Sequence, residues 1–161
     1  MGLEPIPVAV YTDFAVRLFE DRGKHVDRDV VETIWNMFDG YTWFVQMMMN
    51  ELFALTSIGD TCQKDRIPEA QYNVIMSQEN SYKDLMSNIP PKHKVVLQAF
   101  AKEGVARNIT SSHFIKKYNL NSASSVQSAV KLLLKNDLIT QADGAYRVYD
   151  YFFSEWLAKM Y

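Results

Sequence analysis

The sequence predicts a mainly α-helical protein built from two units, a helical bundle and a smaller helical unit that ends in a β-hairpin. Apolar residues recur at helical spacing through most of the 161 residues, and 48% of the residues are hydrophobic, which is ample for packed cores. The stretch "SNIPP", residues 87–91, interrupts this periodicity, because residues before prolines are pushed out of the α region. Asp143-Gly144 separates two short β-prone runs, as in a tight hairpin. We therefore expect two units, 1–86 and 87–161.

The first unit contains four predicted helices, of which the first two carry start and stop signals. "VAVYTDFAVRLFEDRG" has apolar residues at helical spacing, with Gly23 just past its end. Its predicted inward residues are Val10, Phe14, Leu18 and Tyr11. "VDRDVVETIWNMFDG" follows, with Asp27 as a suitable N-cap and Gly40 as its stop. Its predicted inward residues are Val30, Ile34 and Met37 or Phe38.

The third and fourth helices complete the predicted bundle. "WFVQMMMNELFALTSIG" is apolar on most sides and is therefore expected at the centre of the unit, with Thr42 as its cap. A run of aromatic residues and methionines at a helix start is usually core. This predicts burial of Trp43, Phe44, Met47, Met48 and Met49. The fourth helix begins at Pro68 and is predicted to include Tyr72, Ile75, Met76, Tyr82 and Leu85.

The second unit has the element order helix, helix, turn, helix, hairpin. Its helices are predicted in "PKHKVVLQAFAKEG", in "TSSHFIKKYN" with Thr110 or Ser111 as cap, and in "SASSVQSAVKLLLKND". The predicted inward residues are Val95, Val96, Ala99 and Phe100 in the first and Val126, Ala129, Val130 and Leu133 in the third. Residues 138–141 and 145–149 form the hairpin. This order is that of a winged helix-turn-helix.

The closing stretch "YFFSEWLAKMY" is predicted as a last amphipathic helix. Its aromatic side chains have two possible partners, the neighbouring unit or the core of the winged helix itself.

The third helix of the winged unit carries a polar face that could bind a partner. Its predicted outward residues are Ser124, Gln127, Ser128, Lys131 and Lys135. Serine and glutamine can hydrogen-bond to base edges, while lysines can meet phosphates. Lys116, Lys117 and Arg147 could extend a cationic rim, and the helix N-terminus near Ser122 suits a phosphate. The same face can equally be an ordinary solvated surface or a protein-docking surface, and it carries no arginine. Both duplex DNA and a protein therefore remain candidate partners.

Charge and composition restrict the class of protein. Residues 1–86 hold 7 Lys/Arg and 14 Asp/Glu, whereas residues 87–161 hold 10 and 5, so only the second half is suited to a polyanion. Cys62 is the single cysteine, which excludes an intrachain disulfide and favours a reducing, cytoplasmic setting. No apolar run is long enough for a membrane span, and "MGLEPIPVAV" lacks the features of a signal peptide.

Motifs for catalysis and metal binding are missing from the sequence. There is no GxxxxGK[ST], GxGxxG, HExxH or CxxC, and His25, His93 and His113 are scattered. Ser111-Ser112-His113 opens a predicted helix, where a Ser run is more often a cap than a nucleophile. We therefore expect no catalytic residues, no metal site and no enzyme activity in this chain by itself.

The order of these stretches resembles the C-terminal region of a family of prokaryotic AAA+ ATPases of the STAND type, found in archaea and Bacteroidetes. "YTDFAVRLFEDRGKHV" and "IWNMFDGYTWFVQMMMNEL" resemble the helical lid of that family. "IPPKHKVVLQAFAKEG", "ITSSHFIKKYNLNSASSVQSAVKLLLKNDLIT" and "YRVYDYFFSEWL" resemble its winged helix. The resemblance implies a C-terminal piece of an ATPase, with the nucleotide-binding domain as a missing partner and ATP and Mg bound only with that domain.

The resemblance also implies candidate nucleotide-binding residues. In the family a Gly-x-Pro turn of the lid approaches the adenine, and Gly40, Tyr41 and Thr42 occupy that turn here, with Thr42 in place of proline. A lid arginine often senses the γ-phosphate, and Arg17 is the nearest candidate. The alternative is a free-standing transcription regulator with a helical sensing or dimerisation domain.

Overall fold

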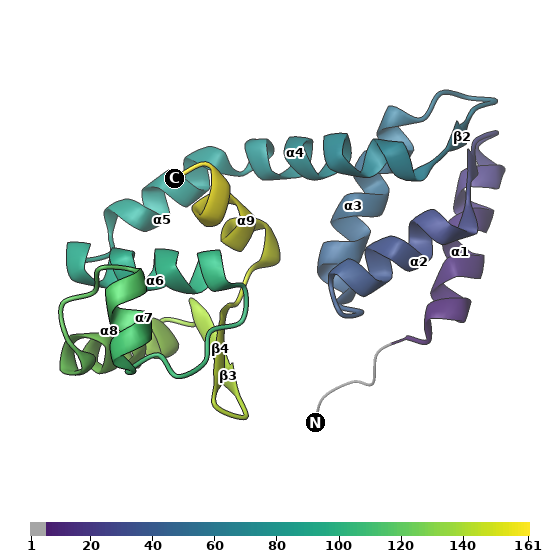
Figure 1. The fold of residues 1–161 in the computed structure, drawn as a ribbon. Helices are drawn as coiled ribbons and strands as arrows, with labels where there is room; N and C mark the ends of the chain where they lie inside the picture. Colours follow the sequence, from purple (N-terminus) through teal and green to yellow (C-terminus); the bar gives the residue numbers. More distant parts are fainter. Residues whose placement is uncertain (1–5) are drawn as a thin grey trace. The chain divides into compact units, whose positions relative to one another are not determined.

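The computed structural model describes residues 6–161 and is mainly helical, with two small sheets (Figure 1). Residues 1–5, part of the stretch in which we found no signal-peptide features, lie outside the described residues. The chain divides into two compact units, one ending at Ser77 and the other comprising Gln78–Tyr161. The division therefore falls one helix earlier than the boundary at residues 86 and 87 expected from the sequence.

The first unit is a helical bundle with one short pair of strands. Its elements are α1 (Val8–Asp21), β1 (His25–Val26), α2 (Arg28–Met37), α3 (Thr42–Leu55), β2 (Thr61–Cys62), a 3₁₀ turn (Lys64–Arg66) and α4 (Ile67–Ser77). Helix α3 contributes Val45, Met48 and Leu52 to the core, each with no exposed side-chain surface. The expected central position of α3 is thus consistent with its burial. Trp43, however, is 69% exposed, so the prediction that it is buried was wrong.

Helix α1 presents a different side to the core from the one the sequence predicted. Its buried residues are Tyr11, Thr12, Ala15 and Phe19. Val10, Phe14 and Leu18, predicted to point inward, are all exposed, Phe14 by 51%. The apolar stripe misled the prediction because two of the residues that pack, Thr12 and Ala15, are small and give little hydrophobic signal. Thr12 satisfies its buried hydroxyl by donating to the carbonyl of Val8 at 2.7 Å.

Two loops of the first unit are joined by a parallel pair of two-residue strands that the sequence did not reveal. His25 pairs with Thr61 and Val26 with Cys62. Just before the strands, the amide of Gly59 donates to the carbonyl of Gly23 at 2.7 Å. The pairing fixes the loop after α1 against the loop after α3, and it buries Val26 and Cys62.

Helix boundaries differ from the predicted ones at α3 and α4. Helix α3 begins at Thr42 itself, and Tyr41 is its N-cap without a side-chain hydrogen bond, so the predicted Thr42 cap was wrong. The helix predicted from Pro68 through Leu85 is divided at Gln78 into α4 and α5 (Glu79–Ser87). Ile75 and Tyr82 are buried, whereas Tyr72 and Leu85 are exposed.

The second unit has the predicted order of a winged helix-turn-helix, preceded by α5. Its remaining elements are α6 (Pro91–Glu103), α7 (Ser112–Lys117), α8 (Ala123–Lys135), β3 (Ile139–Ala142), β4 (Ala145–Val148) and α9 (Tyr151–Lys159). Strands β3 and β4 pair antiparallel around Asp143 and Gly144, both at positive φ, as expected of this dipeptide. Ala106 exchanges two backbone hydrogen bonds with Tyr146 and adds a third, minimal strand to the wing.

Aromatic side chains of α9 close the core of the second unit. Phe152, Phe153, Trp156 and Leu157 are buried. The ring of Tyr82 from α5 lies 5.1 Å from that of Phe153 and 5.5 Å from that of Trp156. Of the two alternatives, packing within the winged unit is therefore correct. On α6, Val96, Ala99 and Phe100 are buried as predicted, whereas Val95 is exposed and Leu97 takes the inward position.

Candidate partner-binding surface of the winged helix

Helix α8 is positioned by a capped N-terminus and a strongly one-sided apolar face. The Ser122 hydroxyl accepts a hydrogen bond from the amide of Ser125 at 3.1 Å, which satisfies one of the helix's unpaired donors. Its buried residues are the four predicted ones, Val126, Ala129, Val130 and Leu133. The candidate binding residues Ser124, Gln127, Ser128, Lys131 and Lys135 are all exposed. The structure thus brings these five side chains together on the solvent side of one helix.

Helix α7 lies before α8 in the helix-turn-helix and supplies two of the candidate rim lysines. The Ser111 hydroxyl accepts from the amide of Phe114 at 3.2 Å, so Ser111 is the helix cap. Lys116 is exposed. Lys117 instead donates to the Glu103 carboxylate at 2.9 Å, and Tyr118 donates to the same oxygen at 2.8 Å. Lys117 is therefore held against the end of α6.

The Glu103 cluster has perturbed acid–base properties. Hydrogen bonds from Lys117 and Tyr118 lower the pKa of the Glu103 carboxyl below its ordinary value. The hydrogen bond to Glu103 raises the pKa of Lys117, and burial followed by the same carboxylate raises the pKa of Tyr118. No pattern in the sequence indicates this cluster, because Glu103 and its two partners lie on different elements.

Arg147, predicted to extend the cationic rim, is not an exposed cation in the wing. It is half-buried on β4, and its guanidinium lies 3.9 Å from the centroid of the Tyr151 ring. A cation over an aromatic face is stabilised by the ring quadrupole. Arg147 therefore links the wing to α9.

The helix-turn-helix segment contains no acidic residue. Residues 104–136 hold Arg107, Lys116, Lys117, Lys131 and Lys135, and no Asp or Glu. Acidic residues flank the segment at Glu103 and Asp137. Because no carboxylate lies on α7 or α8, the exposed surface of these helices is suited to an anionic partner.

In the first unit, the candidate nucleotide-binding residues Gly40 and Tyr41 lie in the turn before α3, and Thr42 is the first residue of that helix. Gly40 has φ 74°, and a Cβ there would lie 2.9 Å from Cζ2 of Trp35. This packing accounts for the glycine without a ligand. Tyr41 and Trp43 are exposed beside it. The ring of Trp35, which packs on Gly40, also contacts the ring of Tyr11 on α1. The candidate Arg17 is exposed on the same helix, about 9 Å further along the helix axis than Tyr11.

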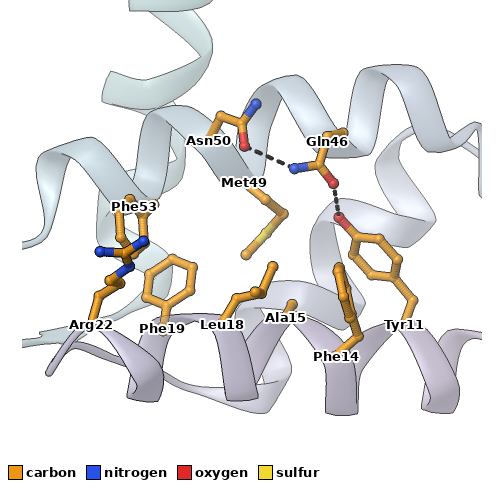
Figure 2. Close-up of a pocket in the computed structure, with 10 residues that line it drawn as sticks. All are labelled: Tyr11, Phe14, Ala15, Leu18, Phe19, Arg22, Gln46, Met49, Asn50 and Phe53. Atoms are coloured by element: carbon orange, nitrogen blue, oxygen red, sulfur yellow. Dashed lines mark hydrogen bonds between the residues drawn. The ribbon is translucent and has the colours of Figure 1, made fainter.

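A groove between α1 and α3 is a feature that the sequence did not predict (Figure 2). Its volume is about 210 Å³, and its apolar lining includes Phe14, Leu18 and Met49. Tyr11 donates to the Gln46 side chain at 3.1 Å, and Gln46 donates to Asn50 at 2.8 Å along one rim. Burial raises the pKa of Tyr11 to about 12, so its hydroxyl remains a donor at neutral pH. The wrong inward face assigned to α1 is the reason that the groove was missed.

Metal clusters and membrane-spanning helices are both missing from residues 6–161. No group of three or more His, Cys, Asp or Glu side chains is arranged to hold a metal ion there. Within the same residues, no helix has the length and apolar character needed to cross a membrane.

Comparison with known proteins identifies the second unit. Residues 80–159 match the family model described as a probable winged helix domain. The match begins within α5 and ends at the last residue of α9, and so covers almost the whole second unit. No curated protein and no solved structure matches the chain. The chain therefore contains a winged helix domain, a class of module that binds DNA or protein.

Proposed function

We propose that the winged helix domain binds duplex DNA by placing the exposed face of α8 in the major groove. The observation that carries this proposal is the absence of any carboxylate from residues 104–136, together with the exposed lysines on α7 and α8, which are Lys116, Lys131 and Lys135. The two other cations of this segment are engaged elsewhere, Lys117 with Glu103 and Arg107 with the main chain of Asp143. Helix α8 has 13 residues and is therefore about 20 Å long, and a B-DNA major groove about 12 Å wide admits such a helix.

The exposed residues of α8 would divide between reading bases and holding the backbone. Ser124, Gln127 and Ser128 can hydrogen-bond to base edges, and glutamine can pair with adenine through two bonds. Lys131 and Lys135 lie nearer the C-terminal end and would contact phosphates, with Lys116 from α7 extending the contact. Since phosphate contacts carry most of the affinity, binding is expected to be strongly salt-dependent.

The proposal is tested by fluorescence anisotropy of the full chain with a labelled duplex between about 50 and 200 mM salt. The double variant Lys131→Ala/Lys135→Ala is expected to bind more weakly and to reduce the slope of log affinity against log salt by about 1.8, or about 0.9 for each lysine that no longer neutralises a phosphate. Lys159→Ala is the matched control, because it removes one lysine that is paired with Glu155 on α9. No salt-dependent binding by the unaltered chain would refute the proposal.

Protein docking is the second candidate function of the same surface. It is favoured by Leu132, which is 42% exposed on α8 next to Lys131, and by the lack of arginine on this helix. An exposed leucine fits a protein partner better than a phosphate backbone. Failure of the unaltered chain to bind DNA at low salt would favour this candidate.

For the whole chain, we propose that it is a non-catalytic C-terminal region of an AAA+/STAND-type ATPase. The support is the resemblance of its two units to a lid and a winged helix, together with the exposed Tyr41 and Trp43 beside Gly40. In this proposal the nucleotide-binding domain is the partner of the first unit, and bound ATP favours one arrangement of the lid and thereby repositions the winged helix. A free-standing regulator is the alternative.

A reading frame that continues upstream into a phosphate-loop sequence would distinguish these two proposals. Calorimetric titration of the longer protein with ATP then tests the lid. Trp43→Ala is a suitable variant, because Trp43 is exposed and its loss leaves the core intact. Unchanged affinity would remove this turn from the nucleotide site.

A further inference from the structure

A polar groove lies directly beside the N-terminal end of α8. It has a volume of about 590 Å³ and is formed by the first half of α6 and the turn between α7 and α8. Its polar lining comprises Lys92, Asn119, Asn121 and Ser125. The groove contains one cation and three neutral hydrogen-bonding side chains, and no carboxylate lines it.

The backbone around this groove is held in place. The amide of Leu120 donates to the carbonyl of Ile115 at 2.8 Å, and Leu120 itself is buried. Asn119 has φ 53°, a left-handed conformation that asparagine tolerates better than most residues. Ser125 lies in the first turn of α8, where the Ser122 cap fixes its amide. The main chain around the groove is therefore fixed, and the side chains that line it include one cation and three neutral hydrogen-bonding groups, which suit a phosphodiester backbone.

The wing differs in charge from this groove. The wing turn has the exposed carboxylate of Asp143 at its tip, with no cation among residues 140–145. Arg107 donates to the main-chain carbonyl of Asp143 at 3.1 Å, so the wing turn has one carboxylate and one neighbouring cation. Arg147 stacks on Tyr151 at the base of the wing. A wing of this composition offers a phosphate little attraction.

We propose that the DNA backbone flanking α8 is bound in the groove between α6 and the α7–α8 turn, and that the wing makes no phosphate contact. This inference rests on the proposed DNA binding by α8 and names the second contact of that site. It makes Lys92 the phosphate ligand on α6 and Asn121 and Ser125 neutral donors to the same backbone.

Two charge-removing variants of the full chain separate the groove from the wing. Lys92→Gln removes the cation of the groove, and Arg107→Gln removes the cation nearest the wing tip. We expect Lys92→Gln to weaken binding of a labelled duplex of about two helical turns and to lower the salt slope by about 0.9. Arg107→Gln should leave both quantities within experimental error of the unaltered chain. Far-UV circular dichroism checks that each variant is folded.

Each outcome of this experiment bears on a different proposal. A lower slope for Arg107→Gln, or an unchanged slope for Lys92→Gln, overturns the groove proposal even if the Lys131→Ala/Lys135→Ala variant shows that α8 binds DNA. Absence of binding by the unaltered chain overturns the α8 proposal and the groove proposal together. Asn121→Ala gives a further check, because it should lower affinity without changing the salt slope, since it removes no charge.

Discussion

At the scale of single residues, Gly40 shows how a glycine can be explained by packing. Its φ of 74° lies in the left-handed region, and the indole of Trp35 occupies the space where a Cβ would project. Gly59, in the same unit, has φ 89° with no atom within 4 Å of a built Cβ. The two positions therefore differ in crowding while sharing a left-handed backbone.

Gly40→Ala is expected to destabilise the first unit more than Gly59→Ala. Both substitutions cost about 1–2 kcal/mol for a left-handed alanine. Gly40→Ala adds an overpacking cost of about 1–3 kcal/mol against Trp35. Urea unfolding followed by tryptophan fluorescence measures the difference. Equal free energies of unfolding for the two variants would show that Trp35 moves aside without cost.

The same comparison affects the choice of variants for nucleotide binding. Because a larger side chain at Gly40 disturbs the packing of Trp35, weaker ATP affinity of such a variant would have two explanations. Exposed neighbours such as Trp43 give a cleaner test, since they can be truncated without opening a cavity.

At the scale of elements, the cluster of Glu103, Lys117 and Tyr118 joins α6 to α7. The pKa of Glu103 is lower in the folded chain than its ordinary value, so the charged carboxylate stabilises the fold. This stabilisation is present above the pKa of the unfolded chain and is lost as the pH falls through the folded pKa. The contribution therefore disappears in acid.

We expect the Glu103→Gln variant to lose less stability than the unaltered chain between about pH 7 and about pH 3. Thermal unfolding at the two pH values measures this difference. Glu155→Gln is the control, because it removes an exposed carboxylate of an i,i+4 pair and leaves the cluster intact. If the Glu103→Gln variant and the unaltered chain lose similar stability in acid, the charged Glu103 carboxylate does not stabilise the fold.

How well an element could be predicted depended on how its faces differ. Apart from the exposed Leu132, helix α8 has apolar residues on one side and polar residues on the other, and all four predicted inward residues are buried. Helix α1 has apolar residues on both sides, so periodicity alone could not select between Phe14 and Phe19. The division between α4 and α5 has no glycine or proline to announce it. The two-residue strands β1 and β2 are too short to have a periodicity.

The candidate site was predictable to a similar extent. The exposed positions of Ser124, Gln127 and Lys131 follow from the period of α8. The sequence could not show that Lys117 is held by Glu103 or that Arg147 lies over Tyr151, because these contacts depend on tertiary packing. The groove beside α8 is likewise formed by segments that are distant in sequence.

At the scale of the whole molecule, α5 belongs with the winged helix domain. Tyr82 and Met86 of α5 are buried, and the indole of Trp156 donates to Glu79 at 3.4 Å. The family match also begins within this helix, at residue 80. A domain boundary at the double proline would therefore cut through a packed core.

A fragment of residues 78–161 should be more stable than a fragment of residues 88–161. The shorter fragment lacks the buried Tyr82 and Met86, and losses of this kind cost about 2–5 kcal/mol for each side chain. Thermal unfolding by circular dichroism compares the two. Lys83→Ala in the longer fragment is the control, because Lys83 is exposed on the same helix. Identical melting temperatures for the two fragments would show that α5 does not stabilise the winged helix domain and would favour the boundary at residues 86 and 87.

The parallel pairing of His25–Val26 with Thr61–Cys62 has a consequence for folding during synthesis. Strand β1 has no partner until β2 has left the ribosome, so the amino-terminal unit cannot close while only its first two helices have emerged. The wing, by contrast, pairs neighbouring residues and can form as soon as its turn is made. Translation pauses placed before codon 61 should therefore prolong the exposure of Val26 and its neighbours to chaperones.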